Sequence, residues 1–391
     1  MKRKLFATVA SLVLAATVSI TATLDKAAAE LSGRSVKIGI MVPLTGKGAE
    51  WGAAAQQGSE MAAEEINAAG GIGGVKIKLV FYDTHTREAD GITIINKLAT
   101  RDNVLAVSGP CFSSLCEVIF PLLDKLKVPT ISYCSAKPGL SKLSTWAFRN
   151  SLTSDKQLAP VVTAWKKAYD IKKVVVIHDL EDAVSKAEGT KVFPLLFKRE
   201  GIEIIDFITF RSKDTDFSAQ VTKAKSLNPD GIALGSCYQQ AAGIVKEARK
   251  QGMKQPFVAG ACTGAPGFID IGGKGTEGTY VSTAAWLEDP RPEVQTFVKK
   301  MLERNGGKPF PYSAPRGYDN IYILKQIMEA EGVTNKSDDL ASDREKIKNG
   351  WAKLKEYPGV AGVTTMNDVG DGSGGVRTLK VVDGKYADIS Q

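Results

Sequence analysis

The sequence predicts an α/β protein with parallel sheets. The first observation is one complete strand, loop, helix and strand near the start of the chain. Residues 36–42 are a short apolar run of buried-strand length, and residues 43–50 form a loop that contains Gly and Pro. Residues 51–69 carry apolar side chains at helical spacing, and residues 75–82 return as a second apolar run. This is a βαβ unit, so its two strands should be parallel.

The second observation is that this alternation repeats in two sets. Residues 104–108 and 129–133 are further strand candidates, each followed by a helical stretch. After Ser151 the alternation restarts. The strand candidates of the second set are residues 174–178, 202–208, 231–235, 256–261 and 279–283. A chain this long exceeds the usual size of one hydrophobic core, so we expect two domains.

The first 29 residues read as an export signal. Residues 1–4 are basic after the initial Met, residues 5–20 are mostly apolar, and residues 27–29 place small side chains where a signal peptidase cleaves. Cleavage near Ala29 is expected, and no Cys stands at that point to carry a lipid anchor. Past residue 30 no apolar run approaches the roughly 20 residues that span a bilayer. The mature protein is therefore expected to be exported and soluble.

The charge pattern argues against nucleic acid as a partner. The formal net charge of +8 falls to +5 without the signal, because four basic residues and one acidic residue leave with it. The remaining Lys residues are scattered along helices and form no basic run interleaved with aromatics.

Several segments resemble the leucine/isoleucine/valine-binding family of type I periplasmic binding proteins. They read, in chain order, VPLTGKGAEWG, EINAAGGIGG, VFYD, GPCFSSLCE, VPTISYCSA, VVVIHD, TDFSAQVTKAKSLNPDGI and GYDNIYIL. The resemblance implies two doubly wound parallel-sheet lobes of the Venus-flytrap kind, joined by a three-stranded hinge. The implied domains are a signal peptide at 1–29, a first lobe at 30–151 and 283–363, and a second lobe at 152–282 and 364–391. It also implies a periplasmic location and delivery of a small ligand to the permease and ATPase subunits of an ABC transporter.

In an open parallel sheet, ligands bind at the carboxyl ends of strands. Ser113 and Ser114 follow the strand candidate at 104–108 and begin a helix, where free N–H groups and hydroxyls favour an anion. Ser113 could instead be a plain helix cap. In the family the matching Ser holds the ligand's carboxylate, and backbone N–H groups at the positions of Cys134 and Ala136 complete that site. The first-lobe candidates for ligand binding are Trp51, Phe112, Ser113, Ser114, Tyr133, Cys134, Ser135 and Ala136. The aromatic members of this set could equally be core residues.

The second lobe departs from the amino-acid binders of the family. Its candidates for ligand binding are Ala183, Cys237, Tyr238, Cys262 and Thr263. Ala183 replaces an aromatic residue, Cys237 replaces a Tyr, and residues 259–265 lack the acid that pairs with the ligand's ammonium. A buried ammonium without a carboxylate partner is costly, so the ligand should lack an amine. Glu181 or Asp182 could instead supply the carboxylate that pairs with an ammonium.

The loss of bulk at positions 183 and 237 predicts an enlarged pocket with flat faces from Trp51, Tyr133 and Tyr238. The predicted ligand is a small aromatic carboxylate of the benzoate, hydroxybenzoate or cinnamate type. A branched-chain or other amino acid is the alternative.

Five Cys in an exported chain invite disulfides, and the odd count leaves at least one thiol. The pairs considered are Cys111 with Cys116 and Cys237 with Cys262. The family's own bridge is absent, because residues 84–86 offer no Cys. The two His residues lack a partner at ligand spacing, so we expect neither a metal nor a cofactor.

The remaining function classes separate on sequence motifs. The chain has no phosphate-binding loop of the kind that powers transport, so a separate ATPase is expected. An enzyme that used Cys262 or Ser113 with His178 is not expected, because no nucleophile elbow is present. A monomeric solute receptor is the leading hypothesis, and a ligand sensor for a signalling receptor stays open beside it.

Overall fold

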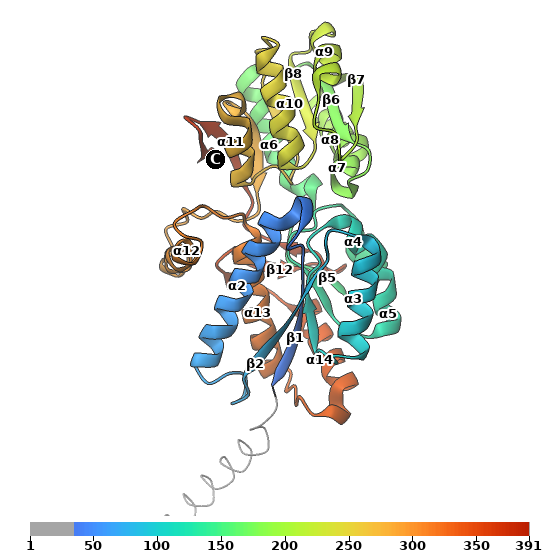
Figure 1. The fold of residues 1–391 in the computed structure, drawn as a ribbon, viewed down its shortest axis with the longest axis vertical. Helices are drawn as coiled ribbons and strands as arrows, with labels where there is room; N and C mark the ends of the chain where they lie inside the picture. The colour runs from blue at the N-terminus through green and yellow to red at the C-terminus, as the bar shows by residue number, and fades with distance from the viewer. Residues whose placement is uncertain (1–34, 391) are drawn as a thin grey trace, which may run out of the picture.

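The computed structural model describes residues 35–390, with the side chain of Lys47 left out. The predicted signal peptide lies outside the described residues. The chain forms two α/β lobes stacked along the long axis of the molecule (Figure 1). Each lobe is built on its own sheet with parallel strands, which confirms the predicted fold class.

The five-stranded sheet of the first lobe has the order β2-β1-β3-β4-β5, and all of its neighbours are parallel. Its strands are β1 (Val36–Val42), β2 (Ile77–Asp83), β3 (Ala106–Ser108), β4 (Thr130–Ser132) and β5 (Ala147–Arg149). The helices between them are α2 (Ala49–Ala68), α3 (Glu88–Thr100), α4 (Ser113–Ile119) and α5 (Leu123–Leu126). The bounds of β1 agree with the predicted strand, whereas β5 was not predicted.

The seven-stranded sheet of the second lobe has the order β15-β14-β10-β9-β8-β6-β7. Its parallel strands are β6 (Lys173–Asp179), β7 (Glu203–Phe210), β8 (Gly231–Gly235), β9 (Phe257–Ala259) and β10 (Tyr280–Thr283). The hairpin of β14 (Arg377–Val382) and β15 (Lys385–Asp388) adds two antiparallel strands at one edge. The helices of this lobe are α6 (Ser154–Tyr169), α7 (Ala183–Ala187), α8 (Phe193–Glu200), α9 (Ser218–Ser226), α10 (Tyr238–Lys250) and α11 (Pro266–Gly272).

Three later helices and a small antiparallel sheet lie beside the first lobe (Figure 1). They are α12 (Pro292–Arg304), α13 (Ser313–Ala330), α14 (Leu340–Lys353), β11 (Tyr357–Gly359), β12 (Gly362–Met366) and β13 (Gly372–Ser373). Two glycines let α13 lie very close to α2. A Cβ on Gly58 would come within 2.1 Å of the Ala314 carbonyl oxygen, and one on Gly317 within 2.7 Å of the Ala55 carbonyl oxygen. The first lobe is therefore completed by chain that returns from the second.

Two buried arginines join the segments that connect the lobes. Arg316 on α13 donates to Asn150 Oδ1 at 3.0 Å, to the Ala284 carbonyl at 2.6 Å and to the Gly374 carbonyl at 3.2 Å. Arg149 Nε donates to Asp371 Oδ1 at 2.8 Å. The implied lobe boundaries stay a proposal, and these contacts lie close to all three implied crossings. Between residues 35 and 390, no helix is both long enough and apolar enough to cross a membrane.

Candidate functional site

A pocket lies where the strand-end loops of the two lobes meet. Its walls are formed by Trp51, Cys111, Phe112, Ser113, Cys134, Ser135, Ala136, Val184, Ala261, Cys262 and Tyr312. The first lobe supplies α2, the loop from β3 to α4 and the loop after β4. The second lobe supplies α7 and the loop after β9, while Tyr312 directly precedes α13. This is the crevice at the carboxyl ends of parallel strands, as expected for an open α/β sheet.

The pocket is small in this conformation. About 340 Å³ between these residues is free of atoms, which includes solvent at the mouth, and only about 20 Å³ admits the centre of a water molecule. The closed pocket therefore holds little more than one water molecule.

Several side chains of the pocket wall can donate hydrogen bonds. Trp51 is 3 % exposed, and its Nε1–H has no partner among the described residues. The Ser135 hydroxyl is buried without such a partner and lies beside the Cys116 thiol, while the Ser113 hydroxyl accepts a 3.2 Å hydrogen bond from the Lys137 N–H. No charged side chain is among the lining residues. The wall can therefore donate to an anion but carries no charge of its own.

The rest of the wall is apolar and spans both lobes. Ala136 from the first lobe packs in one buried cluster with Val184 and Ala261 from the second. The rings of Trp51 and Tyr312 meet edge to face, with centroids 4.7 Å apart. Such a wall suits a ligand whose body is apolar.

A buried carboxyl group lies directly behind the second-lobe wall. Glu188 begins a π-helix (Glu188–Val192) immediately after α7 and is fully buried. Its Oε1 accepts a 2.9 Å hydrogen bond from the Ala261 N–H, and its Oε2 has no partner among the described residues. Burial, with a smaller contribution from the charge of Asp182, raises the pKa of this carboxyl to about 8 against the lowering effect of the Ala261 N–H. Glu188 is four residues past Val184, so both lie on one face of the helix.

The comparisons with known proteins agree with this geometry. Residues 35–385 match the family described as Periplasmic binding protein. The chain belongs to the periplasmic binding protein family. It is 26 % identical to the Leu/Ile/Val-binding protein homolog 3 of Brucella melitensis over 97 % of this chain and 100 % of that protein.

Two solved structures of this kind share the fold of this periplasmic binding protein. One is the branched-chain amino acid transporter substrate-binding protein LivJ of Streptococcus pneumoniae in complex with isoleucine, with 25 % identity, a TM-score of 0.81, and 91 % and 99 % of the two chains covered. The other is a solute-binding protein of an ABC transporter from R. palustris in complex with benzoate, with 19 % identity, a TM-score of 0.80, and 91 % and 96 % covered. Proteins of this family are solute-binding components of ABC transporters and not enzymes.

The structure brings together one part of the predicted site residues of this periplasmic binding protein. The predicted residues that line the pocket are Trp51, Phe112, Ser113, Cys134, Ser135, Ala136 and Cys262. Those that lie outside its lining are Ser114, Tyr133, Ala183, Cys237, Tyr238 and Thr263. The Tyr133 hydroxyl donates to the Met41 carbonyl in the core at 3.3 Å, and Thr263 Oγ1 donates to the Ser236 carbonyl at 3.0 Å.

Tyr238 is engaged in a contact between the lobes. Its hydroxyl donates to the Glu50 carboxylate, which also accepts from the Gly267 N–H. Burial raises the pKa of Glu50, which lies on α2 of the first lobe, while Tyr238 and Gly267 belong to the second. This contact holds the lobes together outside the pocket, and it turns the Tyr238 hydroxyl away from a ligand role.

The expectation of an enlarged pocket is wrong in this structure. Position 183 does not line the pocket, and the larger Val184 does. Cys237 is tied back in a disulfide. The two acids considered as amine partners are also occupied: Glu181 pairs with Arg211 at 3.1 Å, and Asp182 Oδ1 accepts from the Ser185 N–H at 3.0 Å as the cap of α7.

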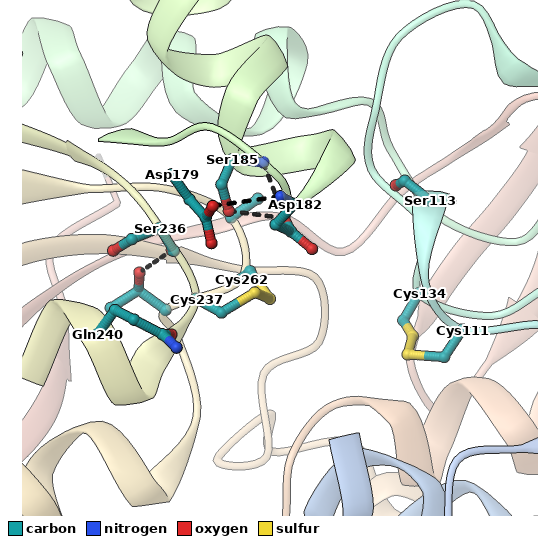
Figure 2. Close-up of a disulfide and its surroundings, with 12 residues drawn as sticks. Cys111, Ser113, Cys134, Asp179, Asp182, Ser185, Ser236, Cys237, Gln240 and Cys262 are labelled. Atoms are coloured by element: carbon teal, nitrogen blue, oxygen red, sulfur yellow. Dashed lines mark hydrogen bonds between the residues drawn. A yellow bond between two sulfur atoms is a disulfide. The ribbon is translucent and has the colours of Figure 1, made fainter. Parts of the chain in front are cut away.

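Of the two disulfide pairs considered from the sequence, one is present in the structure and the other is not. Cys111 is bonded to Cys134 and Cys237 to Cys262 (Figure 2). Cys116 is free and buried. The pair Cys111 with Cys116 is therefore wrong. The reason is that Cys111 and Cys134 follow adjacent strands, whereas Cys116 turns into the core on α4.

Residues that sequence reasoning missed have different origins. Tyr312 follows no strand, so a search of strand ends could not find it. Val184 and Ala261 adjoin predicted positions, and Glu188 could have been found from its spacing of four to Val184. Among the described residues no group of three or more His, Cys, Asp or Glu is placed to hold a metal ion.

Proposed function

We propose that this periplasmic binding protein captures a small monocarboxylate with an apolar body, of the benzoate type, and delivers it to a membrane permease driven by a separate ATPase. The observation that carries this proposal is the unpartnered indole N–H of Trp51 in the wall of the pocket between the lobes.

A carboxylate satisfies the donors of this wall. An indole N–H can only donate, and leaving a buried donor unpaired costs about 1–3 kcal/mol. An acceptor on the ligand would remove that cost. The hydroxyls of Ser113 and Ser135 can rotate to donate to the same anion, and hydrogen bonds to a charged acceptor are the stronger kind.

An apolar body matches the remaining wall. Trp51, Phe112 and Tyr312 offer aromatic surface, and Val184 and Ala261 offer aliphatic surface. The absence of a charged side chain from the lining residues supports a ligand without an amine. A ring needs more space than the closed pocket provides, so the lobes would separate to admit it and close around it.

A matched pair of ligands tests the proposal. Calorimetric titration of the purified protein should show binding of benzoate and none of benzamide, which keeps the ring and removes the charge. Trp51→Phe should weaken benzoate binding by roughly tenfold to a hundredfold, because one hydrogen bond to a charged group is lost. Equal affinity for benzoate and benzamide would overturn the carboxylate assignment.

A branched-chain amino acid is the second candidate, and Glu188 is the observation that favours it. Its carboxyl contacts the loop at 259–265, where the family resemblance places the acid that pairs with an ammonium, but it does so from a different element. The relative from Brucella melitensis and the LivJ protein, by their names, serve branched-chain amino acids.

Leucine and 4-methylpentanoate decide between the two candidates, because they differ only in the α-amine. The primary proposal expects no gain from the amine. Leucine binding tenfold or more tightly than 4-methylpentanoate, with that preference lost in Glu188→Gln, would establish the amino-acid candidate instead.

A further inference from the structure

The two disulfides occupy equivalent places in the two lobes. Cys111 follows β3 and Cys134 follows β4, which are adjacent parallel strands. Cys237 follows β8 and Cys262 follows β9, which are adjacent parallel strands of the other sheet. Each bridge therefore joins two neighbouring strand-end loops within one lobe. Figure 2 shows both bridges together with Ser113 of the pocket wall.

These bridges belong to the wall of the pocket. Cys111 and Cys134 line it from the first lobe and Cys262 from the second. In each lobe the joined loops are also tied by a hydrogen bond: Ser132 Oγ donates to the Pro110 carbonyl at 2.6 Å, and Thr263 Oγ1 to the Ser236 carbonyl at 3.0 Å. One such hydrogen bond opens readily, whereas a covalent bridge does not.

The placement separates the bridges from lobe closure. Neither bridge crosses between the lobes, so neither locks the protein open or closed. Most residues of the buried cores of both lobes lie outside the bridged loops, although Cys111, Cys134 and Cys237 pack at the edge of the larger core. What the bridges restrict is the spacing of the loops that form the pocket.

The fifth cysteine, Cys116, does not readily exchange with the disulfides. Cys116 is buried beside Ser135, and burial raises the pKa of its thiol to about 11. The thiolate is the form that attacks a disulfide, so exchange with the nearby Cys111–Cys134 bridge is suppressed.

We propose that the two disulfides are positioning elements that hold the two walls of the pocket in the geometry that binds ligand, and that full ligand affinity requires both bridges in the oxidised state. The proposal rests on the proposed function, because it concerns the same pocket. Free loops would spend only part of the time in the binding geometry, and the apparent affinity falls by that fraction.

The first test needs no ligand. Hydrogen exchange of the full mature protein is compared with that of Cys237→Ser/Cys262→Ser. Amides at 236–238 and 260–263 should exchange roughly tenfold faster or more, while β8, β9 and the first-lobe loop at 133–137 stay unchanged. The first-lobe loop serves as the internal control, and Cys111→Ser/Cys134→Ser should give the converse pattern. Unchanged exchange in the bridged loops, or an equal rise throughout the lobe, would overturn the positioning role.

The second test measures affinity with benzoate, leucine and 4-methylpentanoate as probes. Removal of either bridge should lower the affinity for whichever probe binds the wild-type protein by roughly tenfold. Unchanged affinity would overturn the requirement for the oxidised state. If none of the probes binds wild type, the proposed ligand class fails, and the exchange comparison alone then decides the positioning role.

If the Cys→Ser variants fail to fold, reduction of the folded wild-type protein provides the same comparison. Dithiothreitol supplies two electrons and two protons to each bridge, which becomes two thiols, and is itself oxidised to a cyclic disulfide. The reduced protein should reproduce the loop-specific exchange. Cys116→Ala, which keeps both bridges, should not.

Discussion

Glu188 should make the stability of this protein depend on pH. Burial raises the pKa of its carboxyl to about 8, compared with 4.5 for the unperturbed group. Between these values the folded state holds a proton that the unfolded chain has released. Because the native state binds more protons, the free energy of unfolding falls as pH rises through this window. The contribution is complete below about pH 4.5 and is lost by pH 8.

The size of the effect follows from the width of the window. At about 1.4 kcal/mol per pH unit, the free energy of unfolding falls by roughly 5 kcal/mol across this window. A fall of half that size is easy to measure. Glu188→Gln removes the titration but keeps a carbonyl that can accept the Ala261 N–H. The variant should match wild type near pH 5 and exceed its unfolding free energy by several kcal/mol near pH 8.

Urea unfolding at several pH values between 5 and 8 provides the assay. Asp319, whose pKa burial raises to about 6, titrates in both proteins and cancels in the difference. Glu181→Gln is the matched control, because Glu181 forms an ion pair with the exposed Arg211, and its effect should stay within a few tenths of a kcal/mol. A difference between wild type and Glu188→Gln that does not change with pH would refute the reasoning.

Two further predictions concern packing and motion. Gly58→Ala should destabilise the protein more than Gly317→Ala, because its Cβ would lie 2.1 Å from a backbone oxygen rather than 2.7 Å, with costs of about 1–3 kcal/mol or more. Melting temperatures equal to that of wild type in both variants would contradict the close approach of α2 and α13. Small-angle scattering should show a smaller radius of gyration with saturating ligand, because the pocket draws its wall from both lobes; an unchanged profile would count against closure.

Part of the candidate site could be predicted because strand ends are visible in the sequence. Ser113 and Cys134 follow strands that the apolar runs at 104–108 and 129–133 predict, and both line the pocket. The same reasoning predicts that Tyr133 lines the pocket, but its side chain turns into the core toward Met41. A strand end predicts where a residue lies along the chain, and the direction of its side chain depends on the local twist of the loop.

The sequence by itself determined the fold class, since runs of strand length alternate with helical spacing over most of the chain and admit few arrangements other than parallel sheets. Only the tertiary structure decided which loops meet. The partner of Cys111 depends on β3 lying beside β4, Tyr312 reaches the pocket because the chain returns to the first lobe, and Glu188 adjoins Ala261 through the packing of α7 on the sheet. These contacts join residues far apart in the chain, and local periodicity carries no record of such distances.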